Sequence, residues 1–153
     1  MITHKQVYYS DFSITQLFDL VMDIEHYPEF IPWCTYAKIL EEPKPNAKIA
    51  ELNATFAGFS EQYTSHVKSF PQKTQKDKAK ISTDIITGPF KHLHSNWIFS
   101  YDKKKQKTKV EFYIEFEFSS KILQMMIGKF FEKASSKMLE AFEERAKKIY
   151  KNR

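Results

Sequence analysis

The sequence predicts an α+β fold in which a curved antiparallel sheet wraps around a long C-terminal helix. Between residues 35 and 118, apolar residues alternate with polar ones at every second position, which is the period of a strand. The connections between these segments are short and suit hairpins rather than crossover helices. After residue 120 the apolar spacing changes to three and four residues, as in a helix. The expected order is one strand, two short helices, six strands and one long helix, in a single domain over residues 1–153.

The N-terminal part is expected to contain the first strand and both short helices. Residues 3–10 predict a strand, and either Asp11 or Ser13 has the side chain of a helix cap. Residues 14–24 carry an apolar stripe at helical spacing. A second helical turn at 26–30 is ended by prolines, which do not fit a helix interior.

Six consecutive strands are expected in the middle of the chain. They cover residues 35–42, 48–56, 59–69, 78–87, 94–102 and 108–118. In the last strand, one face carries Val110, Phe112, Ile114, Phe116 and Phe118, and the other carries Glu111, Tyr113, Glu115 and Glu117. One apolar face and one polar face are typical of an antiparallel sheet that is covered on one side only.

The C-terminal stretch predicts one helix of about 30 residues, roughly 45 Å long at the standard rise. Its apolar positions run from Leu123 to Ile149 at helical spacing. A helix of this length needs a long apolar partner, and the phenylalanine-rich face of the strands supplies one. Gly128 is a weak point within it, because glycine disfavours a helix interior.

Aromatic residues make up 16% of the chain, more than a compact core of this size needs. Two interpretations remain open: a solid aromatic core, or a cavity lined by rings between sheet and helix. The candidate lining residues lie on the inward faces, and they are Phe56, Tyr63, Ile86, Trp97, Phe112, Phe116, Met126, Phe130 and Met138. The methionines suit a pocket that accepts flexible chains.

Charge and cysteine content limit the partners and the cellular compartment that the protein can have. The net charge is +5, which suits an anionic partner such as nucleic acid or a membrane surface without requiring one. A lone cysteine, Cys34, cannot form an intrachain disulfide or a cysteine-based zinc site. No apolar run reaches the ~18 residues of a membrane span, and the N-terminus has no leader pattern. We therefore expect a cytoplasmic protein, with a place at the periphery of the inner membrane as the alternative.

The sequence offers little catalytic chemistry. Its five histidines lack the spacing of a helical zinc site, and no phosphate-binding glycine loop or Gly-x-Ser-x-Gly elbow is present. His92 and His94 could hold a metal together with a distant carboxylate, and Cys34 could act as a nucleophile beside a histidine. Both ideas are weaker than a structural role for these residues. We expect no catalytic residues, no metal and no cofactor, with a cyclase-type enzyme as the minor alternative.

The segment at residues 27–34 resembles the signature of the coenzyme Q-binding START-like family, whose bacterial members include the ribosome association toxins. It reads Tyr27-Pro28-Glu29-Phe30-Ile31-Pro32-Trp33-Cys34. Further stretches match in the same order: Gly88-Pro89-Phe90-Lys91 with Leu93, Trp97-Ile98-Phe99, Phe116-Glu117-Phe118, and Ala141-Phe142 with Arg145, Ala146 and Tyr150. The resemblance covers essentially the whole chain.

This resemblance implies the helix-grip fold of the polyketide cyclase and lipid transport superfamily. It also implies binding of ubiquinone or a related isoprenoid lipid, in support of respiratory electron transport. Two prolines fix a rigid turn, which we expect to present Phe30 and Trp33 at the cavity mouth, and Gly88-Pro89 forms a second tight turn before Phe90. Phe30, Trp33 and Phe90 therefore join the candidate ligand-binding residues.

Two functions of different class follow. In the first, the cavity holds a quinone head by aromatic stacking, with Trp33, Tyr63 or Tyr27 as hydrogen-bond donor and the apolar tail supplying most of the affinity.

In the second, a basic surface binds the large ribosomal subunit and blocks subunit association. In a simple meander, alternate hairpin tips lie at the same end, which would gather lysines near Lys44 and Lys48, at 73–80 and at 103–109. The residues chosen for this surface are Lys73, Lys76, Lys78, Lys103, Lys104, Lys105 and Lys107. The same surface would also suit an anionic membrane. Lysines at hairpin tips that serve only solubility are the plain alternative.

Overall fold

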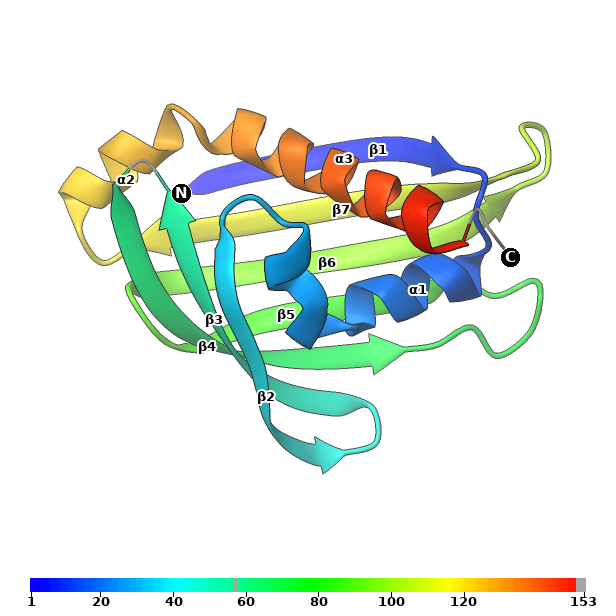
Figure 1. The fold of residues 1–153 in the computed structure, drawn as a ribbon, viewed down its shortest axis with the longest axis horizontal. Coiled ribbons are helices and arrows are strands. Elements are labelled where there is room, and N and C mark those ends of the chain that lie inside the picture. Colours follow the sequence, from blue (N-terminus) through cyan, green and yellow to red (C-terminus); the bar gives the residue numbers. More distant parts are fainter. Residues whose placement is uncertain (57, 151–153) are drawn as a thin grey trace.

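Seven antiparallel strands form one sheet in the computed structural model, which describes residues 1–56, without the side chain of Phe56, and residues 58–150. The strands are β1 (Ile2–Ser10), β2 (Cys34–Lys44), β3 (Ala47–Phe56), β4 (Phe59–Phe70), β5 (Ala79–Thr87), β6 (Phe90–Asp102) and β7 (Lys107–Phe118). Their order across the sheet is β1-β7-β6-β5-β4-β3-β2. Strands β2 to β7 therefore form the predicted meander, and β1 pairs with β7 (Figure 1).

Two helical segments lie between β1 and β2. Helix α1 (Ile14–Met22) begins at Ser13, whose Oγ accepts a hydrogen bond of 3.1 Å from the Gln16 N–H. The Gln16 Oε1 in turn accepts one of 3.0 Å from the Ser13 N–H, so Ser13 rather than Asp11 is the cap. The 3₁₀ helix η1 (Ile24–Glu29) follows and contains Pro28.

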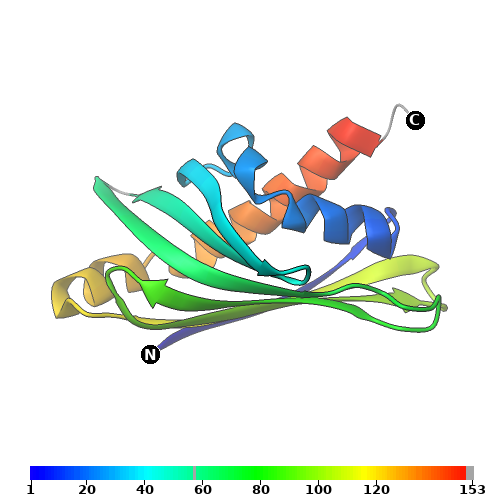
Figure 2. The same cartoon turned by 90° about the horizontal axis from the view of Figure 1, so that it is seen from below.

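The C-terminal stretch is two helices, where the sequence predicted one. Helix α2 (Lys121–Gly128) and helix α3 (Phe131–Tyr150) are separated at residues 129–130. The Phe130 N–H donates to the Ile127 carbonyl at 3.0 Å, a tight turn that ends α2 directly after Gly128. The Ala134 N–H then donates to the Phe130 carbonyl and starts α3. Helix α3 crosses the concave face of the sheet (Figures 1 and 2).

The main core lies between this concave face and the helices α1 and α3. Phe99 and Val110 from the sheet and Leu17 and Phe142 from the helices are all nearly or fully buried. Each such side chain contributes about 1.5–3 kcal/mol by leaving water. None of the helices in the described part of the chain is both long and apolar enough to cross a membrane.

Candidate functional site: two cavities under the concave face

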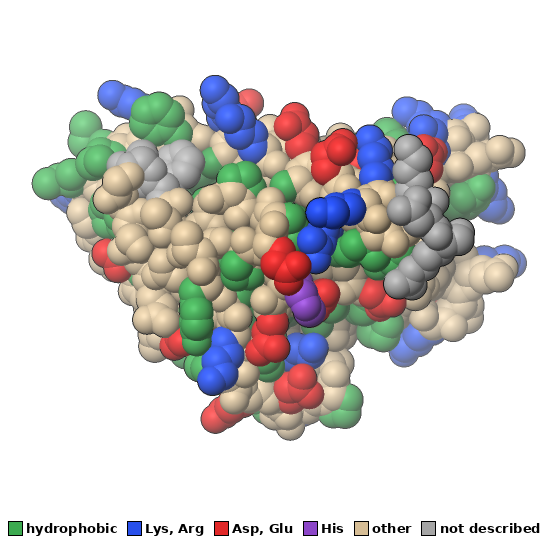
Figure 3. Space-filling model, viewed as in Figure 1, with side chains coloured by type: hydrophobic (Ala, Val, Ile, Leu, Met, Phe, Trp, Pro, Cys, Tyr) green, Lys and Arg blue, Asp and Glu red, His purple; other side chains and the backbone are tan. Residues whose placement is uncertain are grey.

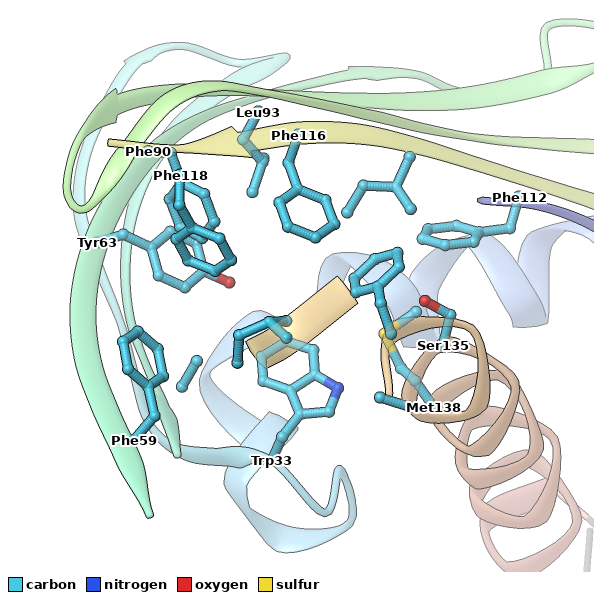
Figure 4. A pocket seen from close by; sticks show the side chains of 15 residues that line it. Trp33, Phe59, Tyr63, Phe90, Leu93, Phe112, Phe116, Phe118, Ser135 and Met138 are labelled. Atoms are coloured by element: carbon cyan, nitrogen blue, oxygen red, sulfur yellow. The ribbon is translucent and has the colours of Figure 1, made fainter. Parts of the chain in front are cut away.

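A cavity of about 130 Å³ lies between the concave face of the sheet and the α2–α3 junction (Figure 4). We call it the α2-side cavity. Its lining is almost wholly apolar and consists of Trp33, Ala54, Phe59, Tyr63, Phe90, Leu93, Phe112, Ile114, Phe116, Phe118, Ile127, Phe131, Ala134, Ser135 and Met138. The wall is therefore built mainly from aromatic rings.

A second cavity of about 110 Å³ adjoins it on the side of α1 and η1, and we call it the α1-side cavity. The two share a wall of six side chains: Trp33, Tyr63, Leu93, Phe112, Ile114 and Met138. Val21 and Ile24 close the far end. The two cavities thus lie on either side of one shared set of side chains under the sheet.

The rings of β6 and β7 are held by contacts with one another. Phe90 and Phe118 stack with centroids 4.7 Å apart, and Phe116 lies 4.4 Å from Phe131 of α3. A register shift between Phe90 and His92 allows Phe90 and Leu93 to face the same cavity although they are three residues apart. These ring contacts fix the wall of the α2-side cavity, which we call the ring wall.

Trp33 is positioned by the turn that follows η1. The Phe30 and Ile31 N–H groups both donate to the Tyr27 carbonyl, at 3.2 and 2.9 Å. The Trp33 carbonyl accepts from the Thr55 N–H at 2.8 Å, which fixes the turn to β3. These bonds direct the indole into the wall shared by the two cavities.

Phe30 has a different place from the one expected at the cavity mouth. Its ring lies 5.2 Å from that of Phe142 and 5.1 Å from the Arg145 guanidinium carbon. The Arg145 Nη2 also lies 3.1 Å from the Glu29 Oε1. Phe30 therefore anchors the turn to α3, and it lines neither cavity.

Gly88 packs the β5–β6 turn directly against Tyr63. Its φ is +145°, and a Cβ at this position would lie 2.6 Å from the Tyr63 Cβ. This close approach brings the Tyr63 ring to 5.7 Å from Phe90. The Gly88-Pro89 turn thus places two of the ring-wall residues.

Polar atoms facing the cavities are few. The Tyr63 hydroxyl points among the rings in Figure 4 and makes no hydrogen bond to another described residue. Burial raises the pKa of Tyr63, so the phenol stays protonated and can donate. Burial also raises the pKa of Tyr27, but its hydroxyl already donates to the Val21 carbonyl. Of the two tyrosines expected as donors, Tyr63 has its hydroxyl available.

The structure brings most of the predicted ligand-binding residues together. Those lining the α2-side cavity are Trp33, Tyr63, Phe90, Phe112, Phe116 and Met138. Trp97 lines the α1-side cavity. The side chain of Phe56 lies outside the described part of the chain.

Three further candidates point away from both cavities. Ile86 is 49% exposed, because the inward positions of β5 are 81, 83 and 85. Met126 is 47% exposed, because α2 turns Ile127 inward instead. Phe130 is 51% exposed in the break between α2 and α3.

Several lining residues were not predicted, although the sequence held a signal for some. Ile114 and Phe118 share the inward face of β7 that the alternation had already identified, and Phe59 precedes Tyr63 by four residues on one face of β4. Ile127 and Phe131 gave no comparable signal, because their inward direction depends on the helix break between them.

The side chains considered for catalysis lie apart from the cavities. Cys34 is buried, and desolvation raises the pKa of its thiol to about 11. His92 pairs with Glu115 and His94 with Asp84, each at 2.8 Å, in cross-strand pairs of β5, β6 and β7. Among the described residues, no three histidine, cysteine or carboxylate side chains form a group that could hold a metal.

The lysine-rich loops lie at the end of the sheet away from α2. The β4–β5 loop, with Lys73, Lys76 and Lys78, and the β6–β7 loop, with residues 103–107, share this end, whereas the β2–β3 turn projects separately (Figures 1 and 2). Lysine side chains are visible over this end in Figure 3.

Lys105 of the β6–β7 loop and Lys107, the first residue of β7, have partners within the protein. Lys105 Nζ lies 3.8 Å from the centre of the Tyr9 ring, and Lys107 Nζ lies 3.2 Å from the Asp11 Oδ1. Lys103 and Lys104 form no ion pair with any described residue.

The sequence matches the family described as polyketide cyclase / dehydrase and lipid transport over residues 10–143. It is 41% identical to the ribosome association toxin RatA of Rickettsia prowazekii, covering 89% of this chain and 90% of that protein. It is 30% identical to the mitochondrial coenzyme Q-binding protein COQ10 homolog B of Xenopus laevis, covering 95% of this chain and 60% of that one.

Solved structures agree with the fold. An 18 kDa protein of Caulobacter crescentus superposes with a TM-score of 0.76 at 29% identity, covering 98% of this chain and 99% of that one. The Zhui aromatase/cyclase of a Streptomyces species superposes with a TM-score of 0.79 at 17% identity, covering 95% and 93%. The second likeness concerns the fold alone.

Proposed function

Because the chain belongs to the polyketide cyclase / dehydrase and lipid transport family, we propose that it binds a hydrophobic small molecule under its sheet without catalysing a reaction on it. The observation that carries this proposal is the ring-lined α2-side cavity of about 130 Å³. Apolar cavities of this kind are the usual sites of small-molecule binding. The absence of charged residues among the described residues lining either cavity favours binding over acid–base chemistry.

The ligand we infer is ubiquinone or a related isoprenoid lipid, carried in support of respiratory electron transport at the inner membrane. The coenzyme Q-binding relative from Xenopus supports this choice. So does the lining, since the rings of Trp33 and Tyr63, which both cavities share, suit a flat quinone head and the apolar wall suits an isoprenoid tail. Tyr63 supplies a donor for one quinone carbonyl.

Mass spectrometry of organic extracts tests this proposal. The protein is purified gently from a bacterial host that makes ubiquinone, and extracts of wild type and two variants are compared. Ala134→Phe fills the α2-side cavity from α3, whereas Ala141→Phe on the same helix lies outside both cavities. We expect isoprenoid lipid in wild type and Ala141→Phe and little in Ala134→Phe. Solvent background in wild type, or equal loading of both variants, would contradict the proposal.

Ribosome association is the second candidate function. It is favoured by the name of the Rickettsia relative and by the lysine-rich loops at one end of the sheet. Such loops bind phosphates without reading sequence, and their binding weakens steeply with salt.

Charge reversal separates this candidate from ligand binding. Glutamate at all three positions of 103–105 should abolish cosedimentation with the large ribosomal subunit and leave lipid extraction unchanged. Charge reversal of Lys5, Lys38 and Lys68, which are exposed elsewhere, gives the same net charge and serves as the control. Sedimentation that is unchanged in the 103–105 variant, or equally lost in both, argues against a docking role for these loops.

A further inference from the structure

Three hydroxyl side chains form a band across the concave face, within the α1-side cavity. They are Ser65 of β4, Thr83 of β5 and Ser95 of β6, and we call them the hydroxyl band. Thr83 is the direct partner of Ser95, and it pairs on its other side with Val67, two residues after Ser65. Thr83 and Ser95 therefore lie at one level of the sheet, and Ser65, which pairs with Ile85, lies diagonally beside them in the next row.

The lining around the hydroxyl band is apolar. Val67 lies at the level of Thr83, Ile81 pairs with Trp97 in the next row, and Leu93 also lines this cavity. A hydroxyl has no packing advantage over an apolar side chain in such a face.

The hydroxyls of the band have no hydrogen-bond partner among the described residues. Ser65 and Ser95 are 1% and 8% exposed, and Thr83 is partly buried. Their oxygens are not among the fully buried unpaired atoms, so they face the space of the cavity, where water or a ligand can be their partner.

We propose that the hydroxyl band is the site for the head of the bound lipid, and that this head is uncharged and carries carbonyl or ether oxygens. This inference rests on the proposed lipid-binding function. The described residues lining the two cavities offer hydroxyl donors, with Tyr63 next to the band, and no charged side chain. A carboxylate or phosphate head would therefore be buried without a counterion, which is strongly unfavourable. Fatty acids and phospholipids are excluded on this ground, and the tail extends into the ring-lined α2-side cavity.

The two tryptophans of the chain provide the measurement, because Trp33 and Trp97 both line the α1-side cavity. A quinone held there quenches their fluorescence. We compare delipidated wild type with the triple variant Ser65→Ala, Thr83→Val, Ser95→Ala. The probes are a short-chain ubiquinone, oleate, and squalene as an isoprenoid without a head.

The triple variant should bind the short-chain ubiquinone at least about tenfold more weakly, since each lost hydrogen bond to a ligand weakens binding by about twofold to tenfold. Squalene binding should be unchanged, and oleate should bind weakly to both proteins. The variant should be at least as thermally stable as wild type, because the band has no partner in the protein.

The results distinguish failure of the hydroxyl band as the head site from failure of lipid binding itself. Equal ubiquinone affinity in wild type and variant, with squalene bound by both, overturns the hydroxyl band as head site and means that it holds water only. Tight binding of oleate overturns the inference of an uncharged head. No binding of ubiquinone or squalene by wild type contradicts the proposed function itself.

An independent observation concerns the outer face of α2. Ile122 and Met125 are 71% and 72% exposed, and Met126 is 47% exposed, in a helix of eight residues. Figure 3 shows hydrophobic side chains gathered over α2. Exposed apolar side chains this close together mark an interaction surface.

We infer that this α2 face docks on an anionic lipid bilayer. The charges around it are complementary, since Lys121, Lys129 and Lys133 are exposed beside it and Glu132 is the one acidic side chain on 121–133. The opposite side of the same helix places Ile127 in the lining of the α2-side cavity. A bilayer contacting α2 would therefore lie next to the space that the lipid tail occupies.

Vesicle flotation tests the α2 face. Wild type should float with vesicles containing phosphatidylglycerol and much less with phosphatidylcholine alone. Ile122→Asp with Met125→Asp should abolish flotation, whereas Tyr36→Asp with Leu40→Asp, which replaces residues 40% and 45% exposed on β2, should not. Flotation that survives the α2 variant, or that is lost instead on charge reversal at 103–105, overturns this inference.

Discussion

Replacement of Gly88 by alanine tests whether the β5–β6 turn holds Tyr63 in place. The new Cβ would lie 2.6 Å from the Tyr63 Cβ and 3.2 Å from the Tyr63 Cα. Carbon atoms in contact normally stand about 3.5–4.0 Å apart. Neither Tyr63 atom can rotate away, so β4 and the turn must separate.

The expected loss has two parts. A φ of +145° in a residue with a side chain costs about 1–3 kcal/mol. Forcing packed atoms apart costs about another 1–3 kcal/mol. We therefore expect Gly88→Ala to lower the free energy of unfolding by about 4 kcal/mol, or the melting temperature by roughly 8–16 °C for a chain of this size.

Gly58→Ala is the matched control. Gly58 also has a positive φ, +82°, but a Cβ there meets nothing within 4 Å. The expected loss in the free energy of unfolding is therefore only that of the positive φ, about 1–2 kcal/mol. Urea unfolding followed by circular dichroism measures both variants. Losses that agree within about 1 kcal/mol would refute the contact between Gly88 and Tyr63 as the cause.

Three further predictions follow. Arg145→Ala should lower the free energy of unfolding by about 1–2 kcal/mol, more than Glu29→Gln does, because the guanidinium also packs on a ring; urea unfolding of both variants checks the order. Desolvation raises the pKa of the Glu143 carboxyl above its value in the unfolded chain. The folded protein is therefore most stable when this carboxyl is protonated, and it loses stability as the pH rises through the raised pKa. Glu143→Gln, which keeps an acceptor for Ser10, should therefore be increasingly stabilised relative to wild type above pH 4.5, and a difference in melting temperature that does not grow with pH would contradict this. Cys34 should react with a thiol reagent at pH 8 only after unfolding, because its thiol pKa is about 11; rapid labelling of the native protein would show the thiol to be accessible.

Local patterns in the sequence were sufficient for the sheet and for much of the ring wall. The alternation in β7 predicts the inward direction of Phe112 and Phe116, and short connections predict the meander. The resemblance at residues 27–34 correctly identified the family, and Trp33 lines both cavities.

What the sequence could not supply depends on pairing between distant segments. Ser65, Thr83 and Ser95 are unremarkable singly, and only the pairing of β4, β5 and β6 brings them together in the lining of one cavity. The exposure of Met126 and Phe130 depends on where α2 ends, and Gly128, the last residue of α2, lies close to Ile2 of β1 at the other end of the sequence. Phe30 lies in a different place from the expected one, because its ring contacts Phe142 and Arg145 of α3, which is distant in the sequence.

The place of β1 at the edge of the sheet has a consequence for the order of folding. Strands β2 to β7 are each joined to a neighbour by a short connection and can pair as they are made, but β1 pairs Ile2 with Phe116 of β7, the last strand in the sequence. Closing so long a loop is entropically costly and slow. The Ser10 hydroxyl bonds to Glu143 at 2.6 Å and the Thr108 hydroxyl to the Phe12 carbonyl at 2.6 Å, so these contacts form only after that closure. Pulse-labelling hydrogen exchange during refolding should therefore show the amides of β5–β7 protected before those of β1. In this order of folding, docking of the N-terminal strand is the step that completes the walls of the cavities.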